Sequence, residues 1–299
     1  MLAAIVLAAT LPHRAIAITF DDLPAAAIPA SERCDAKAIG RWNVKLLATL
    51  KRHHAPALGL ANGRPCLENL ASILNLWLDA GHDLGNHTFS HRDLNSIPLT
   101  EYERDIIRGE TPLRDLLRRR GKRLIYFRHP FLHTGTTSAT RDALGLFLRQ
   151  HNYVVAPVTV DSQEWVFAAA YARALERGDA GLARRLTDAY LPFMEEIADW
   201  FERRSVVVVG REFPQILLLH MNALNANRLD PLLTMLERRG YRFITVDEAL
   251  RDPAYALPDG YVGPKGFSWI ERWAAGKGMP VVQEPREPAW VREASSSPQ

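Results

Sequence analysis

The sequence has few cysteines, no long apolar segment at its N-terminus and little net charge. Its two cysteines, Cys34 and Cys66, are too few for a zinc knuckle or a disulfide framework, so they form either one bridge or two unpaired thiols. The N-terminal apolar run, Met1–Ala9, is too short to span a bilayer as a helix. The formal net charge is +3 and the basic residues are scattered, which argues against nucleic-acid binding.

The N-terminal run has the character of a secretory signal. It is rich in Ala, Leu and Ile, and the small residues Ala8 and Ala9 suit cleavage. Residues 1–14 are therefore predicted to be a signal peptide or N-terminal extension, and the protein to be exported to the periplasm or the extracellular space. No Lys or Arg precedes the run, which leaves an alternative: the segment belongs to the fold and the protein is cytoplasmic.

Short apolar runs alternate with amphipathic stretches over residues 15–252, a pattern typical of a βα-type fold. We predict strands over residues 15–20, 57–61, 124–127, 153–160, 216–219 and 241–246. We predict helices over residues 39–53, 67–80, 100–120, 137–151 and 231–239. A helical insertion is expected at 166–204, and a short further strand at 206–209. The segment 253–299 is predicted to be an irregular tail packed on the barrel, with a disordered end.

Polar residues recur at the ends of the predicted strands. Asp21 and Asp22 follow the first strand, and three further strands end at Arg128, Asp161 and His220. In barrels of parallel strands this rim is where the active site is built. The pattern predicts a single site assembled from distant parts of the chain.

Two histidines and a nearby acid pair predict a metal site. Positions i and i+4 of a helical turn share a face, so His87 and His91 can reach one ion if their segment is helical. Zinc commonly takes two His and a carboxylate and keeps an open position for water. Asp21 or Asp22 would supply the carboxylate and the other would act as a base. Zn²⁺ is expected, although Co²⁺, Ni²⁺ and Mn²⁺ suit the same donors.

Five segments of the chain resemble, in order, the motifs of the polysaccharide deacetylase family (carbohydrate esterase family four, the nodulation-deacetylase type). The matching segments are Thr19–Asp22, His87–His91, Arg128–Phe131, Asp161–Trp165 and Leu218–His220. Each motif alone is weak, but five in order with sensible spacing are specific. The resemblance covers about Ala15 to Leu250 and implies a distorted (β/α) barrel of about seven strands.

The resemblance also implies roles for individual residues. Asp22, His87 and His91 would bind the metal, Asp21 would be the catalytic base and His220 the general acid. Arg128 would orient and tune the base, and Asp161 the acid. The substrate would be bound by Pro130, Phe131, Trp165 and Leu218. The backbone N–H near Phe131 would donate a hydrogen bond to the oxyanion.

The chain departs from the family pattern at three places. Phe131 stands where many relatives have Tyr, and Glu164 replaces the commoner Asp before Trp165. The replacement by Glu164 is expected to be harmless if that side chain is peripheral. The insertion at 166–204 and the tail lie outside the shared motifs and leave the substrate open.

Three functions fit these residues. The leading hypothesis is metal-dependent removal of N-acetyl groups from an amino-sugar polysaccharide or oligosaccharide. An alternative keeps the fold and metal but hydrolyses a non-carbohydrate C–N bond, as in a cyclic imide or ureide. A third is a catalytically silent carbohydrate-binding protein, for which the loss of a metal ligand or the base would be the expected sign. The predicted partner is thus a carbohydrate, not a nucleic acid.

Overall fold

A computed structural model of the protein describes residues 14–63 and 67–296. The predicted signal Met1–Ala9 lies outside the described residues, and so does Cys66. Cys34 is disulfide-bonded, so the question of a bridge is answered for this cysteine.

In the described part of the chain, eight strands form one sheet in which every pairing is parallel. They are β1 (Arg14–Leu23), β2 (Ala57–Ala61), β3 (Asp83–Asn86), β4 (Tyr126–Phe127), β5 (Val154–Val155), β6 (Val160–Asp161), β7 (Gln215–His220) and β8 (Tyr241–Ile244). The order is β5-β4-β3-β2-β1-β7-β6, and β8 pairs with the start of β1. The predicted α/β fold is confirmed.

The sheet curls into a distorted barrel. Strands β5 and β6 lie at opposite edges of the sheet, yet only residues 156–159 connect them. So short a connection spans no more than about 17 Å, so the two edges must lie close together. The tail adds a backbone hydrogen bond here, because the N–H of Trp269 donates to the Val158 carbonyl at 2.6 Å.

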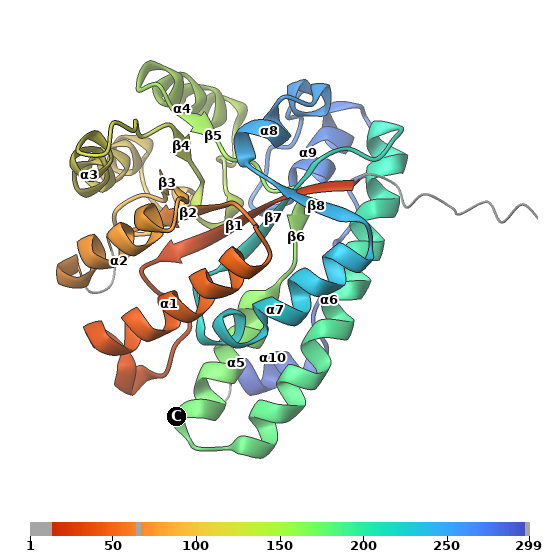
Figure 1. Ribbon diagram of the computed structural model, residues 1–299. Coiled ribbons are helices and arrows are strands. Elements are labelled where there is room, and N and C mark those ends of the chain that lie inside the picture. Colours follow the sequence, from red (N-terminus) through yellow and green to blue (C-terminus); the bar gives the residue numbers. More distant parts are fainter. Residues whose placement is uncertain (1–13, 64–66, 297–299) are drawn as a thin grey trace, which may run out of the picture.

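Helices surround the sheet (Figure 1). They include α1 (Ala36–Arg52), α2 (Leu67–Asp79), α3 (Leu99–Arg118), α4 (Ser138–Gln150), α7 (Ala223–Arg238) and α8 (Val246–Leu250). The α1 helix begins where the Asp35 carboxylate accepts from two backbone N–H groups. On α2, the fully buried Trp77 meets Phe20 of β1 edge-on, with ring centroids 5.6 Å apart. These apolar contacts fix the helices against the strands that carry the site.

The insertion consists of α5 (Glu164–Glu176) and the long α6 (Ala180–Val209) (Figure 1). The strand predicted over residues 206–209 is wrong, because these residues are the last turn of α6. β-branched residues favour strands in isolation, but burial of Val208 against the core outweighs that preference. The helix ends at Gly210, whose φ of 88° suits a glycine cap.

The prediction of an irregular tail is wrong. Within residues 253–296, the described part of the tail, lie the helices α9 (Trp269–Gly276) and α10 (Ala289–Ser296). Trp273 is buried against the rings of Phe213 and Tyr255, at 5.6 and 5.5 Å between centroids. The α10 helix packs along α5. Burial of the tail aromatics supplies the apolar contacts that stabilise short helices. The predicted disordered end includes residues 294–296, which are helical, and 297–299, which lie outside the described part.

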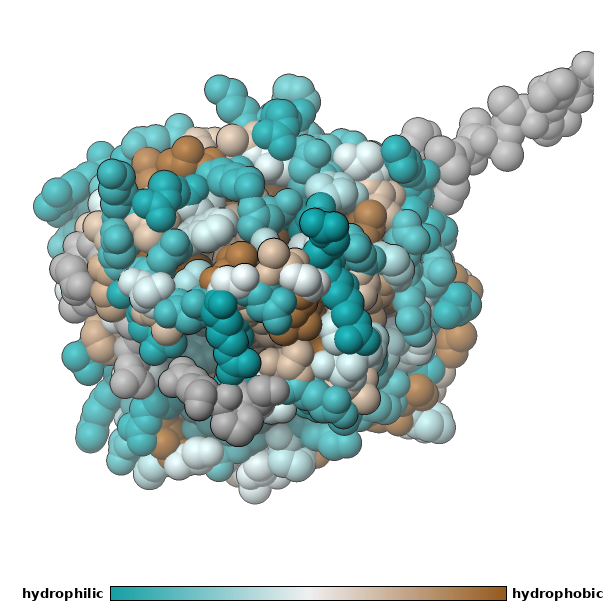
Figure 2. Space-filling model, turned by 90° about the horizontal axis from the view of Figure 1, so that it is seen from below, coloured by the Kyte–Doolittle hydropathy of each residue, from teal (hydrophilic) through white to brown (hydrophobic). Residues whose placement is uncertain are grey.

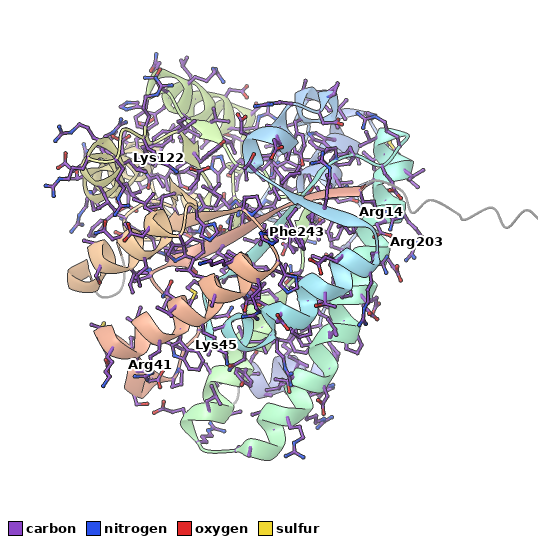
Figure 3. All side chains as sticks on the ribbon, viewed as in Figure 1. Arg14, Arg41, Lys45, Lys122, Arg203 and Phe243 are labelled. Atoms are coloured by element: carbon purple, nitrogen blue, oxygen red, sulfur yellow. The ribbon has the colours of Figure 1, made fainter. Side chains whose placement is uncertain are left out.

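Charged side chains cover the outside of the helices. Hydrophilic residues dominate the face in Figure 2, with hydrophobic residues gathered in small patches among them. Arg41 and Lys45 lie on the exposed side of α1 (Figure 3). At the start of β1, Arg14 pairs with Glu202 at 3.0 Å and Glu212 at 2.7 Å. Among residues 14–63 and 67–296, no helix combines the length and apolarity needed to cross a membrane.

Candidate active site

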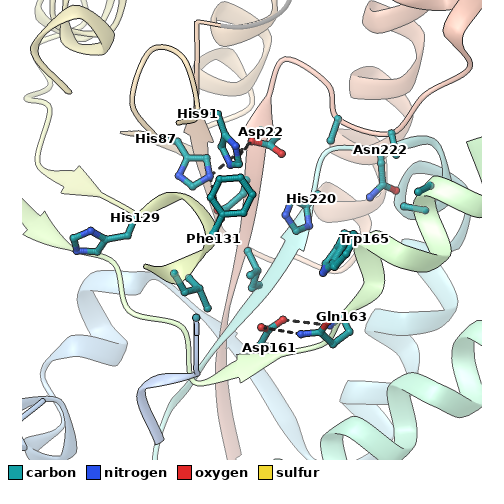
Figure 4. A pocket seen from close by; sticks show the side chains of 18 of the residues that line it. Asp22, His87, His91, His129, Phe131, Asp161, Gln163, Trp165, His220 and Asn222 are labelled. Atoms are coloured by element: carbon teal, nitrogen blue, oxygen red, sulfur yellow. Dashed lines mark hydrogen bonds and ion pairs between the residues drawn. The ribbon is translucent and has the colours of Figure 1, made fainter. Parts of the chain in front are cut away.

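The predicted site residues meet at the carboxyl ends of the strands. Asp21 and Asp22 lie near the end of β1, Asp161 and His220 end β6 and β7, and Arg128 follows β4 directly. Because the strands are parallel, these ends face the same side of the barrel. They border a cavity of about 470 Å³ that is also lined by residues from the insertion and the tail (Figure 4).

The two histidines lie on a loop, so the helical turn considered for their spacing is not formed. Thr88 and His91 have φ of 61° and 50°, which no right-handed helix allows. The Thr88 Oγ1 accepts from the His91 N–H at 3.0 Å, and Asp105 of α3 accepts from the N–H and hydroxyl of Ser90, both at 2.8 Å. These local hydrogen bonds, rather than a helix, bring His91 beside His87.

Asp22, His87 and His91 converge in a way that could hold a metal ion. One donor atom from each lies within 4.8 Å of the others. The His87 Nδ1 donates to the Arg128 carbonyl at 3.0 Å, which directs the Nε2 lone pair toward the Asp22 carboxylate. Burial, with the charge of His91 adding to it, lowers the His87 pKa to about 3, so the ring is neutral as a metal ligand must be. Asn62 donates to Asp22 at 2.7 Å and fixes that carboxylate. The donors therefore fit a divalent cation.

Asp21 lies beside this set and is paired with a buried arginine. The carboxylate is 2% exposed, and its Oδ1 accepts from the Arg128 Nη1 at 2.7 Å. Arg128 is fully buried and also donates to the Thr19 hydroxyl at 2.7 Å and the Ala156 carbonyl at 3.1 Å. These bonds fix the guanidinium, so the Asp21 charge is compensated and its Oδ2 faces His87 at 3.6 Å.

His220 faces the same cavity from the other side and is held by Glu164. The Glu164 Oε1 lies 3.0 Å from the His220 Nδ1 and also accepts the His220 backbone N–H. Burial alone would lower the His220 pKa, but the hydrogen bond and charge of Glu164 outweigh it and raise the pKa to about 9. The imidazole is therefore protonated at neutral pH.

Glu164 is not peripheral, so the condition for a harmless replacement is not met. Its side chain is 1% exposed and accepts further hydrogen bonds from Asn222 at 3.1 Å and Asn225 at 3.0 Å. Asp161, for which a role in tuning the acid is predicted, accepts hydrogen bonds from the N–H and side chain of Gln163, at 3.2 and 3.3 Å. Its burial raises the pKa of the Asp161 carboxyl.

Apolar side chains form the walls of the cavity. Phe131 and Trp165 are 52% and 47% exposed and flank it, and Leu218 contributes to its lining (Figure 4). Pro130, also predicted to bind substrate, is buried and lies outside the lining. The tail reaches this rim at Gly266, where a Cβ would lie 1.8 Å from the Phe131 carbonyl oxygen.

Comparison with known proteins agrees with this geometry. The model of the family described as "Polysaccharide deacetylase" matches residues 8–146. Over these residues the chain is similar to the polysaccharide deacetylase family. The match includes the three candidate metal ligands, Asp21 and Arg128, while the segment with Glu164 and His220 lies beyond it.

The named relatives of this chain are distant in sequence. The peptidoglycan-N-acetylglucosamine deacetylase PgdA of Listeria monocytogenes serotype 1/2a is 23% identical over 237 residues, which are 79% of this chain and 39% of that protein. The chain thus spans well under half the length of this relative.

Two solved structures share the fold. One is a family 4 carbohydrate esterase from Streptomyces lividans in complex with acetate, with 18% identity, 79% and 95% of the two chains covered and a TM-score of 0.50. The other is a CE4 family pseudoenzyme from Bacillus anthracis, with 15% identity, 81% and 66% covered and a TM-score of 0.50.

Sequence reasoning missed three supporting residues. Glu164 is a charged residue inside a recognised motif, but the sequence does not indicate that its side chain is buried. Asn62 follows the end of β2, so the rule that polar residues at strand ends build the site would have found it. Asp105 lies in the middle of α3 and carried no such signal. The cavity is also lined by His129 and His133, to which no role had been given.

Proposed function

We propose that this protein is a metal-dependent hydrolase that removes N-acetyl groups from an amino-sugar polysaccharide or oligosaccharide. One observation carries the proposal: the arginine-paired carboxylate of Asp21 lies beside three converging metal donors, and a protonated His220 faces the same cavity. The deacetylase names of the relatives support the same reaction for this chain.

In this mechanism Asp22, His87 and His91 would hold the metal, for which Zn²⁺ suits the donor set best. When bound, the ion would act as a Lewis acid and lower the pKa of a water molecule that it binds. Asp21 accepts the proton of the attacking water, and the hydrogen bond from Arg128 orients this base.

His220 would complete the reaction as the general acid. The water oxygen adds to the acetyl carbon, the C–N bond breaks and the products are acetate and a free amine. The amine nitrogen needs a proton to leave, and the Glu164 carboxylate keeps His220 protonated so that it can donate one. Asp161, buried at the end of β6, would act on the electrostatics of this acid without touching its ring.

The acetyl group would lie between Trp165 and Leu218, where its methyl meets apolar side chains. The backbone N–H of Phe131 is proposed as a donor to the developing oxyanion. A polymer substrate is favoured over a small imide or ureide because the aromatic walls, Phe131 and Trp165, are about half exposed. A silent binding protein is disfavoured because the proposed ligands, base and acid are all present.

Export from the cytoplasm is part of the proposal. Disulfides persist in oxidising compartments, and Cys34 is disulfide-bonded. A periplasmic or extracellular location would give the enzyme access to an amino-sugar polymer of the cell surface.

The experiment that tests the proposal measures acetate release from N-acetylglucosamine oligomers by the purified protein. The assay is run as purified, after chelation, and after return of zinc or cobalt. Release that stops on chelation and returns with metal would support the proposal. Metal binding without acetate, together with hydrolysis of a cyclic imide or ureide, would favour the alternative. A protein that binds no metal would refute the site assignment.

A further inference from the structure

His133 lines the catalytic cavity but has no part in the proposed reaction. It follows the short turn Pro130–Leu132 after β4, and its backbone N–H donates to the Pro130 carbonyl at 3.1 Å. Its side chain is 16% exposed, so the ring is neither buried in the core nor free in solvent. A histidine in this position can contact a ligand of the cavity if one of its ring nitrogens is available.

A hydrogen bond to Asp93 fixes the ring of His133. The Asp93 Oδ1 lies 2.7 Å from the His133 Nδ1, and an ionised carboxylate can only accept, so Nδ1 carries the hydrogen. Asp93 is itself held, because it accepts from the Asn95 N–H at 2.8 Å and from the Ser96 hydroxyl at 3.3 Å. No other side chain among residues 14–63 and 67–296 hydrogen-bonds to this ring. The Nε2, on a different edge of the ring, is left for a partner from outside the protein.

Phe131 places His133 one ring away from the candidate metal ligand His91. The centroid of the Phe131 ring lies 4.7 Å from that of His91 and 5.8 Å from that of His133. Phe131 is about half exposed and flanks the cavity (Figure 4). A sugar that packs on Phe131 with its acetyl group at the metal ligands would therefore have His133 beside it.

The other polar side chains of the lining that have no assigned role in the reaction are buried or already bonded. The Gln163 Nε2 donates to Asp161 at 3.3 Å, and Asn222 donates to Glu164 at 3.1 Å. His129 is 4% exposed and its Nδ1 is closed off from solvent. In Figure 4 its ring lies apart from the other labelled side chains. Among the described residues of the lining, His133 is thus the polar group outside the reaction that a ligand can reach.

We propose that His133 is a substrate-binding residue, whose Nε2 forms a hydrogen bond with a hydroxyl group of the glycan. The inference rests on the proposed function, because it takes an amino-sugar chain as the substrate. A sugar hydroxyl that leaves water for the cavity needs a new partner, or binding is weakened. A hydroxyl both donates and accepts, so it suits Nε2 whether the ring is neutral or charged. A few polar groups of this kind determine how a ligand is oriented between apolar walls.

Calorimetry with the N-acetylglucosamine tetramer tests binding. All proteins carry Asp21→Asn, so that the substrate is bound but not consumed. His133→Asn places an amide nitrogen where Nδ1 lies, so it keeps a donor for Asp93 but has no atom at the position of Nε2. It should bind the tetramer about tenfold more weakly than the parent. His133→Gln extends an amide to the position of Nε2 and should recover part of the loss.

His53→Asn is the matched control. His53 lies at the end of α1, outside the cavity lining, and its ring nitrogens are 2.9 Å from Glu237 and 3.1 Å from Asp230. The change therefore also removes a carboxylate-paired histidine, and the tetramer should bind as it does to the parent. Equal affinities in the parent and H133N, a loss in H133N that H133Q does not relieve, or an equal loss in H53N would overturn the inference.

Turnover is measured with Asp21 intact. H133N should raise KM for the tetramer about tenfold and change kcat much less, because the contact is made in the bound substrate and in the transition state alike. Acetate release with the same KM in H133N and the wild type would overturn the inference and leave the proposed function standing. Absence of acetate from the wild type would refute the proposed function instead, while the calorimetric comparison would still decide the role of His133.

Discussion

Glu164 and His220 form a buried pair in which the Glu164 Oε1 lies 3.0 Å from the His220 Nδ1. The glutamate is the first residue of α5 and the histidine is the last residue of β7, so a single contact couples the insertion to the strand end. The same carboxylate accepts from Asn222 and Asn225. The carboxylate therefore orients the imidazole and determines its charge.

Replacement of Glu164 by Gln should lower the His220 pKa from about 9 toward the usual value of about 6.5. The general acid must be protonated, so the alkaline limb of kcat should move to lower pH by about two units, and kcat at pH 8 should fall about 10- to 100-fold. The pH profile of acetate release measures this shift, and NMR titration of the His220 ring checks it directly.

Tyr190→Phe is the matched control for this prediction. The Tyr190 hydroxyl donates to the Asn225 Oδ1 at 2.8 Å, so its loss disturbs the surrounding network without removing the carboxylate. The alkaline limb should stay where it is in the wild type. An unchanged limb in E164Q would mean that another group is the acid.

The same pair should make folding stability depend on pH. The His220 pKa is raised in the folded protein, so the pair stabilises the fold fully below about pH 6.5, and this contribution is lost as pH rises through about 9. Urea unfolding of metal-free protein at pH 6, 8 and 10 should show the wild type losing stability over this range more steeply than E164Q. Parallel curves for the two proteins would contradict the assigned shift.

Substitutions of the adjacent carboxylates Asp21 and Asp22 should affect metal binding and catalysis separately. Asp22→Asn removes a proposed ligand and should weaken zinc binding about 100-fold, whereas Asp21→Asn should keep zinc and lose turnover about 1000-fold or more. Equilibrium dialysis with metal analysis gives the stoichiometry, and acetate release gives the rate. Equal zinc affinities in the two variants would contradict the assignment of Asp22.

The strand ends were predictable from the sequence. An apolar run indicates each strand, and the polar residue at which it stops indicates the edge of the sheet that carries the site: Asp21, Arg128, Asp161 and His220. The loop conformation of the two histidines was not, because i,i+4 spacing favours a helix and the competing bonds come from Thr88 and from Asp105, a residue distant in sequence.

The partner of His220 could not be predicted for a related reason. Asp161 and Glu164 both lie in the same motif, and only the three-dimensional turn at Gln163, with φ of 52°, decides which carboxylate meets the ring. The tail helices depend on tertiary burial of residues such as Trp273, which a short Pro- and Gly-rich segment does not reveal.

Arg128→Met should destabilise the protein by about 3 kcal/mol, because it leaves the buried Asp21 carboxylate without its partner. The double variant R128M/D21N should recover part of this loss, since the amide no longer needs a counter-charge. Urea unfolding of the wild type, both single variants and the double variant gives the coupling energy. Strictly additive effects would show that the ion pair does not couple the two residues.

Gly266 should be intolerant of even a methyl group. A Cβ there would lie 1.8 Å from the Phe131 carbonyl oxygen, and moving this backbone atom away would cost stability. Gly266→Ala should therefore displace the tail from the cavity rim and raise KM for acetylated oligomers, with a loss of about 1–3 kcal/mol in unfolding free energy.

Gly40→Ala is the matched control, because a Cβ at this position in α1 meets nothing within 4 Å. It should stabilise the protein by about 0.5–1 kcal/mol and leave KM unchanged. A G266A variant with wild-type stability and KM would mean that the tail does not constrain the Phe131 rim.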